Sequence, residues 1–135
     1  MKRIPTDLQI LNAIYQRYYQ VFAAYSEKNK QRTTKNFVPV DIKTIAKDLD
    51  VDPDIILGRL HYHLDKKYGY DTGENERVSF FAEGFARDGN CINFILLASV
   101  LADMREQNKK YRIATTMAVV SLSLSIFSLV IHFWR

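Results

Sequence analysis

Residues 45–70, IAKDLDVDPDIILGRLHYHLDKKYGY, contain the turn that decides the fold of this chain. Asp52 is a favoured N-cap residue and Pro53 a favoured first helical residue, so a helix is expected from residue 53 to about Lys66. Only three residues separate Pro53 from Leu49, the last inward residue of a preceding short helix. The sequence therefore predicts two helices that are joined by a tight turn.

Further elements are expected before this turn. Thr6 and Gln9 have the spacing of a capping box, which predicts a first helix that runs to about Tyr25. An extended piece at residues 37–40 follows, and Asp41 then caps the short helix. The apolar face of the first helix is wide, which is typical of packing into a core; it comprises Leu11, Tyr15, Tyr18, Phe22 and Tyr25, extended sideways by Ile10, Ile14 and Val21.

After the turn, two apolar or aromatic runs flank the polar residues 71–76, which predicts a β-hairpin. A loop with two glycines comes next. Residues 91–104, CINFILLASVLADM, then have a helical composition, but their apolar run is too short to span a bilayer. We expect this segment to pack on the first helix or on a second copy of the chain.

This order of elements, together with the amino-acid sequence of residues 45–70, resembles the winged-helix family of helix-turn-helix domains over about residues 5–83. In that family the second helix of the turn, here residues 53–66, enters the DNA major groove, and the hairpin, here about residues 67–82, is the wing. The resemblance implies a mainly α domain with a small β-hairpin wing.

The leading end of the expected recognition helix departs from the DNA-binding pattern. Asp52 and Asp54 lie there, and carboxylates repel phosphate. Compensating contacts to nucleic acid or to another partner are expected from Arg59, His61, Tyr62, Lys66 and Lys67, and from Lys28, Lys30, Arg32 and Lys35 in a basic loop. The sequence favours protein binding over DNA binding as the use of this fold. The partner itself is left open and is either a cytoplasmic protein or a nucleic acid.

The last part of the chain predicts a membrane span. Residues 113–134 carry no formal charge, and a helix of this length is ~33 Å long, about the thickness of the hydrocarbon layer. Four basic residues precede the segment and only Arg135 follows it, so the positive-inside rule places residues 1–112 in the cytoplasm. The alternative is a helix covered by other protein. We expect a tail-anchored, single-pass protein of a bacterial inner membrane, with a winged-helix-like domain at 1–90 and a connecting or dimerisation helix at 91–112.

Small and polar residues form one stripe along this span. They follow one another at spacings of 4, 3, 4, 3 and 4, which is one face of a helix; the stripe comprises Ala114, Ala118, Ser121, Ser125, Ser128 and His132. In lipid such a stripe favours self-association, so a homo-oligomer through residues 91–134 is expected. Two alternatives remain: a pore lined by the stripe, or a monomeric anchor in which each hydroxyl bonds the carbonyl one turn back.

Residue patterns for catalysis are weak. His61 and His63 are two apart and point to different sides of a helix, Cys91 lies among apolar residues, and the glycines form no phosphate-binding motif. We therefore expect no catalytic residue, no metal and no cofactor.

Two functions remain. The first is a non-enzymatic membrane effector, of the toxin or antiphage abortive-infection type, in which a partner-binding module controls an oligomerising span. The alternative is a membrane-tethered winged-helix transcriptional regulator that binds DNA.

Overall fold

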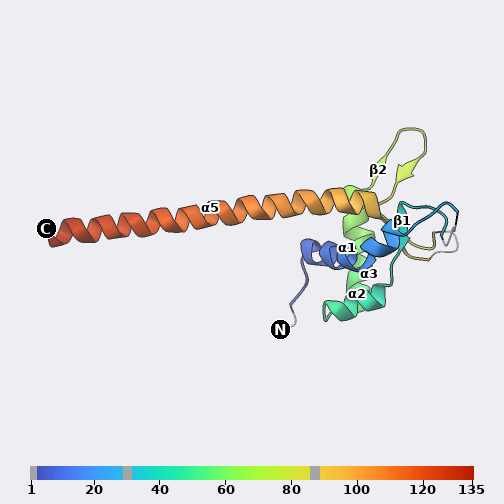
Figure 1. Ribbon diagram of the computed structural model, residues 1–135, viewed down its shortest axis with the longest axis horizontal. Helices are drawn as coiled ribbons and strands as arrows, with labels where there is room; N and C mark the ends of the chain where they lie inside the picture. Colours follow the sequence, from blue (N-terminus) through green and yellow to red (C-terminus); the bar gives the residue numbers. More distant parts are fainter. Residues whose placement is uncertain (1–2, 29–31, 86–88) are drawn as a thin grey trace. The chain divides into compact units, whose positions relative to one another are not determined.

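The computed structural model describes residues 3–28, 32–85 and 89–135. The chain falls into two compact units, Met1–Leu101 and Ala102–Arg135, called here the N-terminal and C-terminal units. It is mainly helical, with small antiparallel sheets in the N-terminal unit. Figure 1 shows the helices and strands in chain order.

Helix α1 spans Asp7–Ala23 and begins with the predicted capping box. The backbone N–H of Gln9 donates to the Thr6 hydroxyl at 3.2 Å, and the Thr6 N–H donates to the Gln9 side chain at 2.9 Å. The helix ends two residues earlier than expected. Its buried face consists of Ile10, Leu11 and Ile14, whereas Val21, expected at the edge of that face, is exposed.

The tight turn between two helices is confirmed. Helix α2 spans Ile42–Asp48 with Asp41 as its N-cap, and α3 spans Pro53–Gly58 with Asp52 as its N-cap. The hydrogen bond from the Thr44 hydroxyl, at 2.6 Å, holds the pKa of the Asp41 carboxyl below its ordinary value.

Helical structure continues beyond α3 without a break. A π-helical segment, η1, spans Arg59–Leu64, and α4 spans Asp65–Tyr68. We call these three segments together the 53–68 helix. It buries Ile56, Leu60 and Leu64 completely. The neighbouring His63 is exposed, with half of its side chain accessible, so Leu64 is the inward residue of this turn.

The predicted hairpin is present as a separate two-stranded sheet. Strands β2, Tyr70–Asp71, and β3, Arg77–Val78, pair antiparallel around the polar tip. The tip uses two residues with positive φ, Gly73 and Asn75. The segment expected as the wing thus contains a hairpin that lies outside the main sheet.

The main sheet has three antiparallel strands in the order β1-β5-β4. Strand β1 spans Phe37–Pro39, β4 spans Phe81–Ala82 and β5 spans Cys91–Asn93. The prediction that the helix begins at residue 91 is therefore wrong. Residues 91–93 pair with a strand on each side, and Cys91 and Ile92 are fully buried. At its start, the helical composition of residues 91–104 is therefore overridden by sheet pairing.

The main sheet is connected to the 53–68 helix through Asp65. Its carboxylate accepts hydrogen bonds from the backbone N–H groups of Phe80, at 2.7 Å, and Phe81, at 3.1 Å. The Arg77 guanidinium donates to the Asp65 carbonyl at 3.0 Å and to its carboxylate at 3.3 Å. A Cβ at Gly69 would lie 2.6 Å from that carbonyl oxygen, which explains why a glycine follows α4.

Helix α5 spans Phe94–Trp134 and starts directly after β5. Its first turns belong to the N-terminal unit, in which the Phe94 ring stacks on Tyr15, with centroids 5.4 Å apart, and on Phe22, at 4.8 Å. Both partners lie on α1. The expectation that this segment packs on the first helix is therefore confirmed for its start.

Candidate functional site

Arg59, the first candidate contact on the 53–68 helix, pairs within the N-terminal unit. Its guanidinium donates to the Asp7 carboxylate, with a distance of 2.9 Å from Nε to Oδ1. His63 lies 3.2 Å from the other Asp7 oxygen. The Asp7 side chain is only 16% exposed, so this cluster connects the start of α1 to the 53–68 helix. Sequence reasoning missed Asp7, because it lies 52 residues from Arg59 and no local pattern relates the two.

The surface of the 53–68 helix that lies opposite its buried residues presents two large exposed side chains, one apolar and one aromatic. We call Ile55, Gly58, Tyr62 and Lys66 its outer face. Ile55 is 45% exposed and Tyr62 is 76% exposed. A Cβ at Gly58 would lie 3.8 Å from the Tyr62 ring, so the ring lies beside this glycine. Among the candidate contacts, Tyr62 and Lys66 are therefore presented outward.

Carboxylates flank the start of this outer face. Asp52 and Asp54 are both exposed, and the Asp52 side chain accepts from the Asp54 backbone N–H at 2.9 Å. Lys67 lies at the far end of the helix with its ammonium group 5.2 Å from the centre of the Tyr68 ring. From its start to its end, the outer face is therefore flanked first by carboxylates, then carries an apolar and an aromatic side chain, and ends at lysines.

The two candidate histidines have different partners. His61 lies 3.4 Å from Glu83 in the segment after β4, whereas His63 lies beside Asp7. The expectation that they point to different sides is confirmed. Within residues 3–28, 32–85 and 89–135, no three His, Cys, Asp or Glu side chains form a group that could hold a metal ion. Cys91 is fully buried in β5, as expected for a packed thiol.

The basic loop contributes less to a binding surface than expected. Arg32 donates to the backbone carbonyls of Val21, Phe22, Thr34 and Lys35, at 2.8 to 3.4 Å, and lies over the Tyr25 ring. It therefore supplies a donor to the Val21 carbonyl at the C-terminal end of α1, and a further donor to the Phe22 carbonyl, which also accepts from the Tyr25 backbone N–H.

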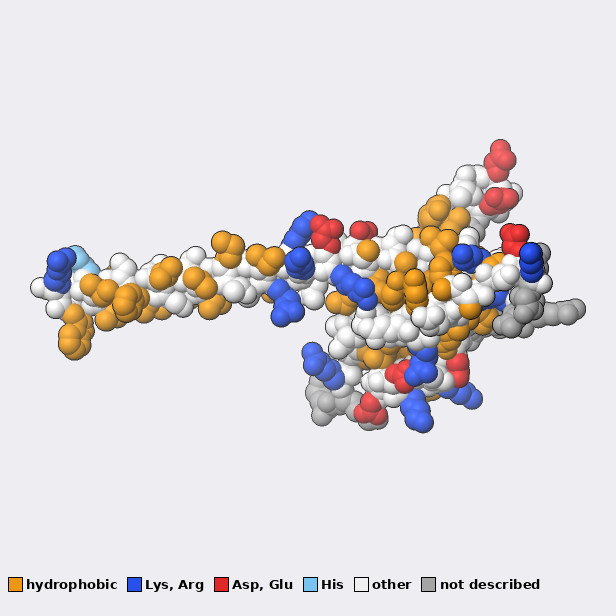
Figure 2. Space-filling view, in the orientation of Figure 1, with side chains coloured by type: hydrophobic (Ala, Val, Ile, Leu, Met, Phe, Trp, Pro, Cys, Tyr) orange, Lys and Arg blue, Asp and Glu red, His pale blue; other side chains and the backbone are white. Residues whose placement is uncertain are grey.

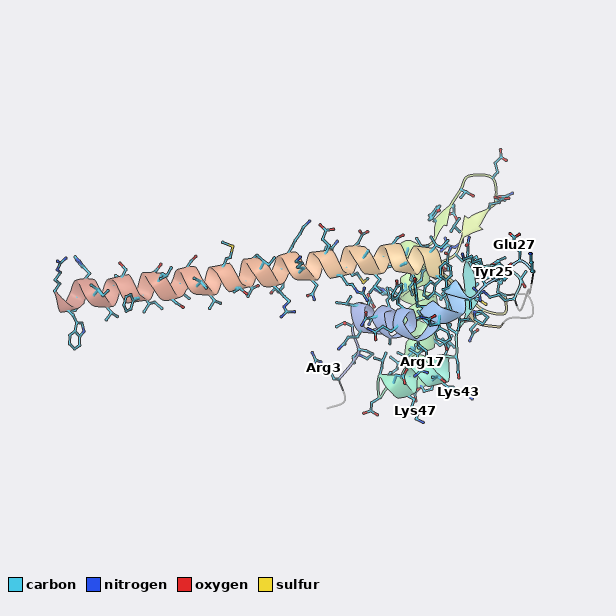
Figure 3. All side chains as sticks on the ribbon, in the orientation of Figure 1. Arg3, Arg17, Tyr25, Glu27, Lys43 and Lys47 are labelled. Atoms are coloured by element: carbon cyan, nitrogen blue, oxygen red, sulfur yellow. The ribbon has the colours of Figure 1, made fainter. Side chains whose placement is uncertain are left out.

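The other loop lysines are placed differently. The Lys35 ammonium lies 5.3 Å from the centre of the Phe22 ring, and Lys28 is exposed. Lys30 lies outside the described residues. Exposed basic residues also occur on α1 and α2, as Figure 3 shows for Arg17, Lys43 and Lys47, and Arg17 pairs with Asp48 there.

In the C-terminal unit, α5 contains one segment long and apolar enough to cross a membrane, with a mean hydropathy of 2.0. This is consistent with a single-pass membrane protein. Figure 2 shows basic side chains gathered at one place on α5, beside acidic ones. Apolar side chains follow, and the C-terminal end carries another basic side chain and a histidine. Within the described chain, this helix alone has these properties.

Several hydroxyls of the apolar segment bond their own helix. Ser125 donates to the Ser121 carbonyl at 2.9 Å, and Ser123 donates to the Val119 carbonyl at 2.8 Å. This is the geometry expected for a monomeric anchor. A hydroxyl whose O–H donates in this way can still accept a hydrogen bond through its oxygen lone pairs, so the same geometry is compatible with a helix contact along the stripe.

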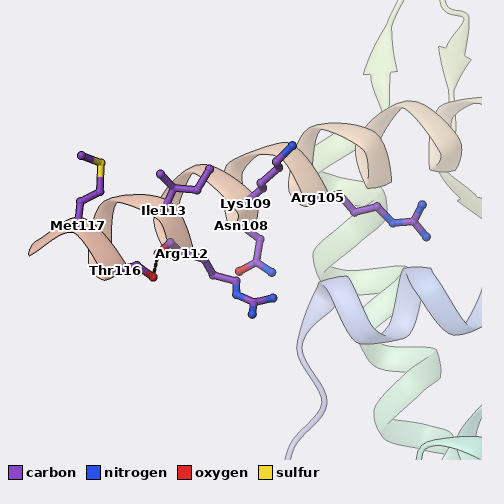
Figure 4. Close-up of a pocket in the computed structure, with 7 residues that line it drawn as sticks. All are labelled: Arg105, Asn108, Lys109, Arg112, Ile113, Thr116 and Met117. Carbon is purple, nitrogen blue, oxygen red and sulfur yellow. Dashed lines mark hydrogen bonds between the residues drawn. The ribbon is translucent and has the colours of Figure 1, made fainter. Parts of the chain in front are cut away.

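Seven residues on one side of α5 line an open hollow, drawn in Figure 4. Sequence reasoning used the basic residues of this region only for membrane orientation. Their grouping with apolar residues on one helix side was not predicted, although it follows from their spacing of three and four. The lining residues are Arg105, Asn108, Lys109, Arg112, Ile113, Thr116 and Met117.

Comparison of the chain with protein-family models, with curated proteins and with solved structures gave no match. The function is therefore inferred from the residues and their geometry.

Proposed function

We propose that the protein is a non-enzymatic membrane effector, in which the N-terminal unit binds a protein partner and the apolar segment of α5 self-associates in a bacterial inner membrane. In this proposal residues 1–112 lie in the cytoplasm. The single observation that supports it most strongly is the outer face of the 53–68 helix, where Ile55 and Tyr62 are exposed and Asp52 and Asp54 lie at the leading end.

The chemistry of this face favours a protein over a nucleic acid. A DNA-reading helix presents cations and amides to phosphates and base edges. Here Arg59 is occupied by Asp7 and the leading end is acidic. A protein segment with an apolar side chain for Tyr62 and a Lys or Arg for the carboxylates fits the face better. The DNA-binding regulator is therefore the less supported candidate.

Helix α5 offers a route from partner binding to the membrane. It is one helix from Phe94, which packs on α1, to the end of the apolar segment. In the apolar segment, the stripe of small and polar residues is the surface on which copies would meet, because small residues let helices approach closely in lipid. We expect assembled copies with Ser121, Ser125 and Ser128 at the contact to place polar groups inside the bilayer and so make the membrane permeable to ions.

The membrane part is tested by changing Ser121, Ser125 and Ser128 together to leucine. Leucine removes the close approach and the hydroxyls but keeps the segment apolar, so membrane localisation is expected to persist. Induced expression in a bacterium should then no longer cause depolarisation or growth arrest, followed with a potential-sensitive dye. Ser123→Leu is the matched control, because Ser123 lies off the stripe, and it should depolarise like the unchanged chain. Full depolarisation by the triple variant would refute self-association through the stripe.

The partner-binding part is tested by Tyr62→Ala. Because the Tyr62 side chain is mostly exposed, we expect a change in unfolding free energy within about 0.5 kcal/mol but a loss of the depolarisation caused by the full chain. Tyr70→Ala, at an exposed tyrosine on β2, is the control and should retain it. If Tyr62→Ala instead left depolarisation intact, the outer face would not be the partner surface. Absence of depolarisation by the unchanged chain, together with salt-sensitive retardation of duplex DNA by the full chain in detergent, would favour the regulator over the effector.

A further inference from the structure

The hollow on α5 combines two kinds of side chain in a definite order along the helix. Arg105, Asn108, Lys109 and Arg112 come first, and Ile113, Thr116 and Met117 come next on the same side (Figure 4). The successive spacings are 3, 1, 3, 1, 3 and 1, so the seven residues form two neighbouring i, i+4 rows that wind gradually around the helix. Twelve residue steps extend ~18 Å along the axis. We call this surface the juxtamembrane groove.

The groove changes from cationic to apolar within one helical turn. The Thr116 hydroxyl donates to the Arg112 carbonyl at 2.9 Å, so its proton is used within the helix and its methyl group remains available for apolar contact. Ile113 and Met117 are both exposed beside it. The polar part therefore ends at Arg112, where the uncharged segment begins.

Not every cation of this region belongs to the groove. Lys110 is directed elsewhere and pairs with Glu106 one turn back, at 2.7 Å. Lys109 and Lys110 are thus adjacent in sequence, yet only Lys109 lines the groove. Substitution of Lys109 or of Lys110 removes the same charge, but only substitution of Lys109 changes the groove. Comparing the two lysines therefore distinguishes an effect of the groove from an effect of charge alone.

We propose that the juxtamembrane groove binds an anionic glycerophospholipid of the bilayer that α5 crosses. The guanidinium groups of Arg105 and Arg112 and the ammonium of Lys109 bind the headgroup phosphate, and Ile113 and Met117 contact the start of an acyl chain. The order of cations, then apolar side chains, matches the order of phosphate, glycerol and acyl chain in such a lipid, and the charges are complementary. The inference rests on the proposed membrane location of the segment that follows Arg112.

The test uses the full chain in nanodiscs of phosphatidylcholine that contain trace spin-labelled lipids. Electron paramagnetic resonance measures the fraction of labelled phosphatidylglycerol and of labelled phosphatidylcholine that the protein immobilises, and their ratio is the preference for the anionic lipid. We expect a preference of about five-fold or more, since one juxtamembrane cation is worth about that factor at an anionic surface. The labelled lipids are present in both leaflets of the nanodisc, so the measured preference does not depend on the direction in which the chain crosses the bilayer.

The decisive comparison is Lys109→Gln against Lys110→Gln. Lys109→Gln should reduce the preference severalfold and Lys110→Gln should leave it nearly unchanged, although each removes one positive charge. Changing Arg105, Lys109 and Arg112 together to glutamine should bring the ratio close to one. Circular dichroism confirms that each variant keeps its helix.

Four results would overturn the proposal. The first two are no preference in the unchanged chain and equal losses for the two lysine variants. The third is loss of the preference when phosphate replaces chloride at constant ionic strength, which would assign the groove to free phosphate. The fourth is failure of the chain to enter nanodiscs. The outcome is independent of the effector assay: depolarisation can be absent while the lipid preference is intact, and then only the proposed function fails.

Discussion

Replacement of Phe94 by alanine is expected to lower the free energy of unfolding of the N-terminal unit by about 3–5 kcal/mol, the usual cost of removing a buried phenyl ring. Phe94 is 1% exposed and lies stacked between Tyr15 and Phe22 of α1. Alanine removes both ring contacts and leaves a cavity that two aromatic rings cannot close by small shifts.

The measurement is a urea titration of the full chain in non-ionic detergent, followed by the near-ultraviolet circular dichroism of its tyrosines. Seven of the eight tyrosines lie between residues 15 and 70, so the signal reports the N-terminal unit. Phe127→Ala is the matched control, because it makes the same change in the apolar segment of α5, where Phe127 is 64% exposed. Equal midpoints for Phe94→Ala and the unchanged chain would contradict the packing of α5 on α1.

The same substitution has a consequence for the proposed effector. Phe94 is the first residue of α5 and its ring joins that helix to α1. If partner binding acts on the membrane through α5, weakening this contact should uncouple the two without changing the stripe. Phe94→Leu, which retains an apolar side chain, is expected to recover part of the lost stability.

Local signals in the sequence were sufficient for the helix starts. Thr6, Asp41 and Asp52 all cap helices as predicted, because a cap depends on a side chain and backbone groups two or three residues away. The hairpin around residues 71–76 was predicted for the same reason, since a polar tip that contains a glycine favours a turn by its local sequence. The apolar segment of α5 was evident from length and composition.

Contacts between distant parts of the chain were not predictable in this way. Residues 91–104 as a whole have a helical composition, and only the two strands that flank residues 91–93 make these three a strand. Arg59 was expected to face a partner, and its pairing with Asp7 depends on a contact across 52 residues. Arg32 was expected to be part of a basic surface, yet it binds carbonyl groups of α1. In each case a tertiary partner decides the role that a local pattern leaves open.

These corrections change the interpretation of the candidate partner surface. Arg59 and Arg32 both bind within the N-terminal unit and no longer count as candidate contacts. Of the candidates on the 53–68 helix, Tyr62 and Lys66 lie on the outer face, and Lys67 follows them at the end of the helix. The remaining surface is aromatic and bounded by acids at one end and lysines at the other. Three cations, Arg105, Lys109 and Arg112, lie together on α5 next to the apolar segment. In the proposed membrane location, the anion that they would contact is the surface of an anionic bilayer rather than DNA.

Asp65→Ala is expected to lower the free energy of unfolding of the N-terminal unit by about 3 kcal/mol, because it leaves two backbone N–H groups of the main sheet without an acceptor. Those groups belong to Phe80, which is fully buried, and Phe81, which is 3% exposed. Alanine also removes the carboxylate from Arg77. The urea titration described for Phe94 measures the change.

Two further variants separate the causes. Asp65→Asn keeps a side-chain oxygen that accepts from the two N–H groups but loses the charge, so it should cost about 1 kcal/mol, less than alanine does. Asp48→Ala breaks the exposed ion pair with Arg17 and should change stability by less than about 1 kcal/mol, as surface pairs do. If Asp65→Ala cost no more than Asp48→Ala, the carboxylate would not be what connects the 53–68 helix to the main sheet. A loss equal for Asp65→Asn and Asp65→Ala would instead assign the whole effect to the ion pair with Arg77, and the hydrogen bonds to β4 would contribute little.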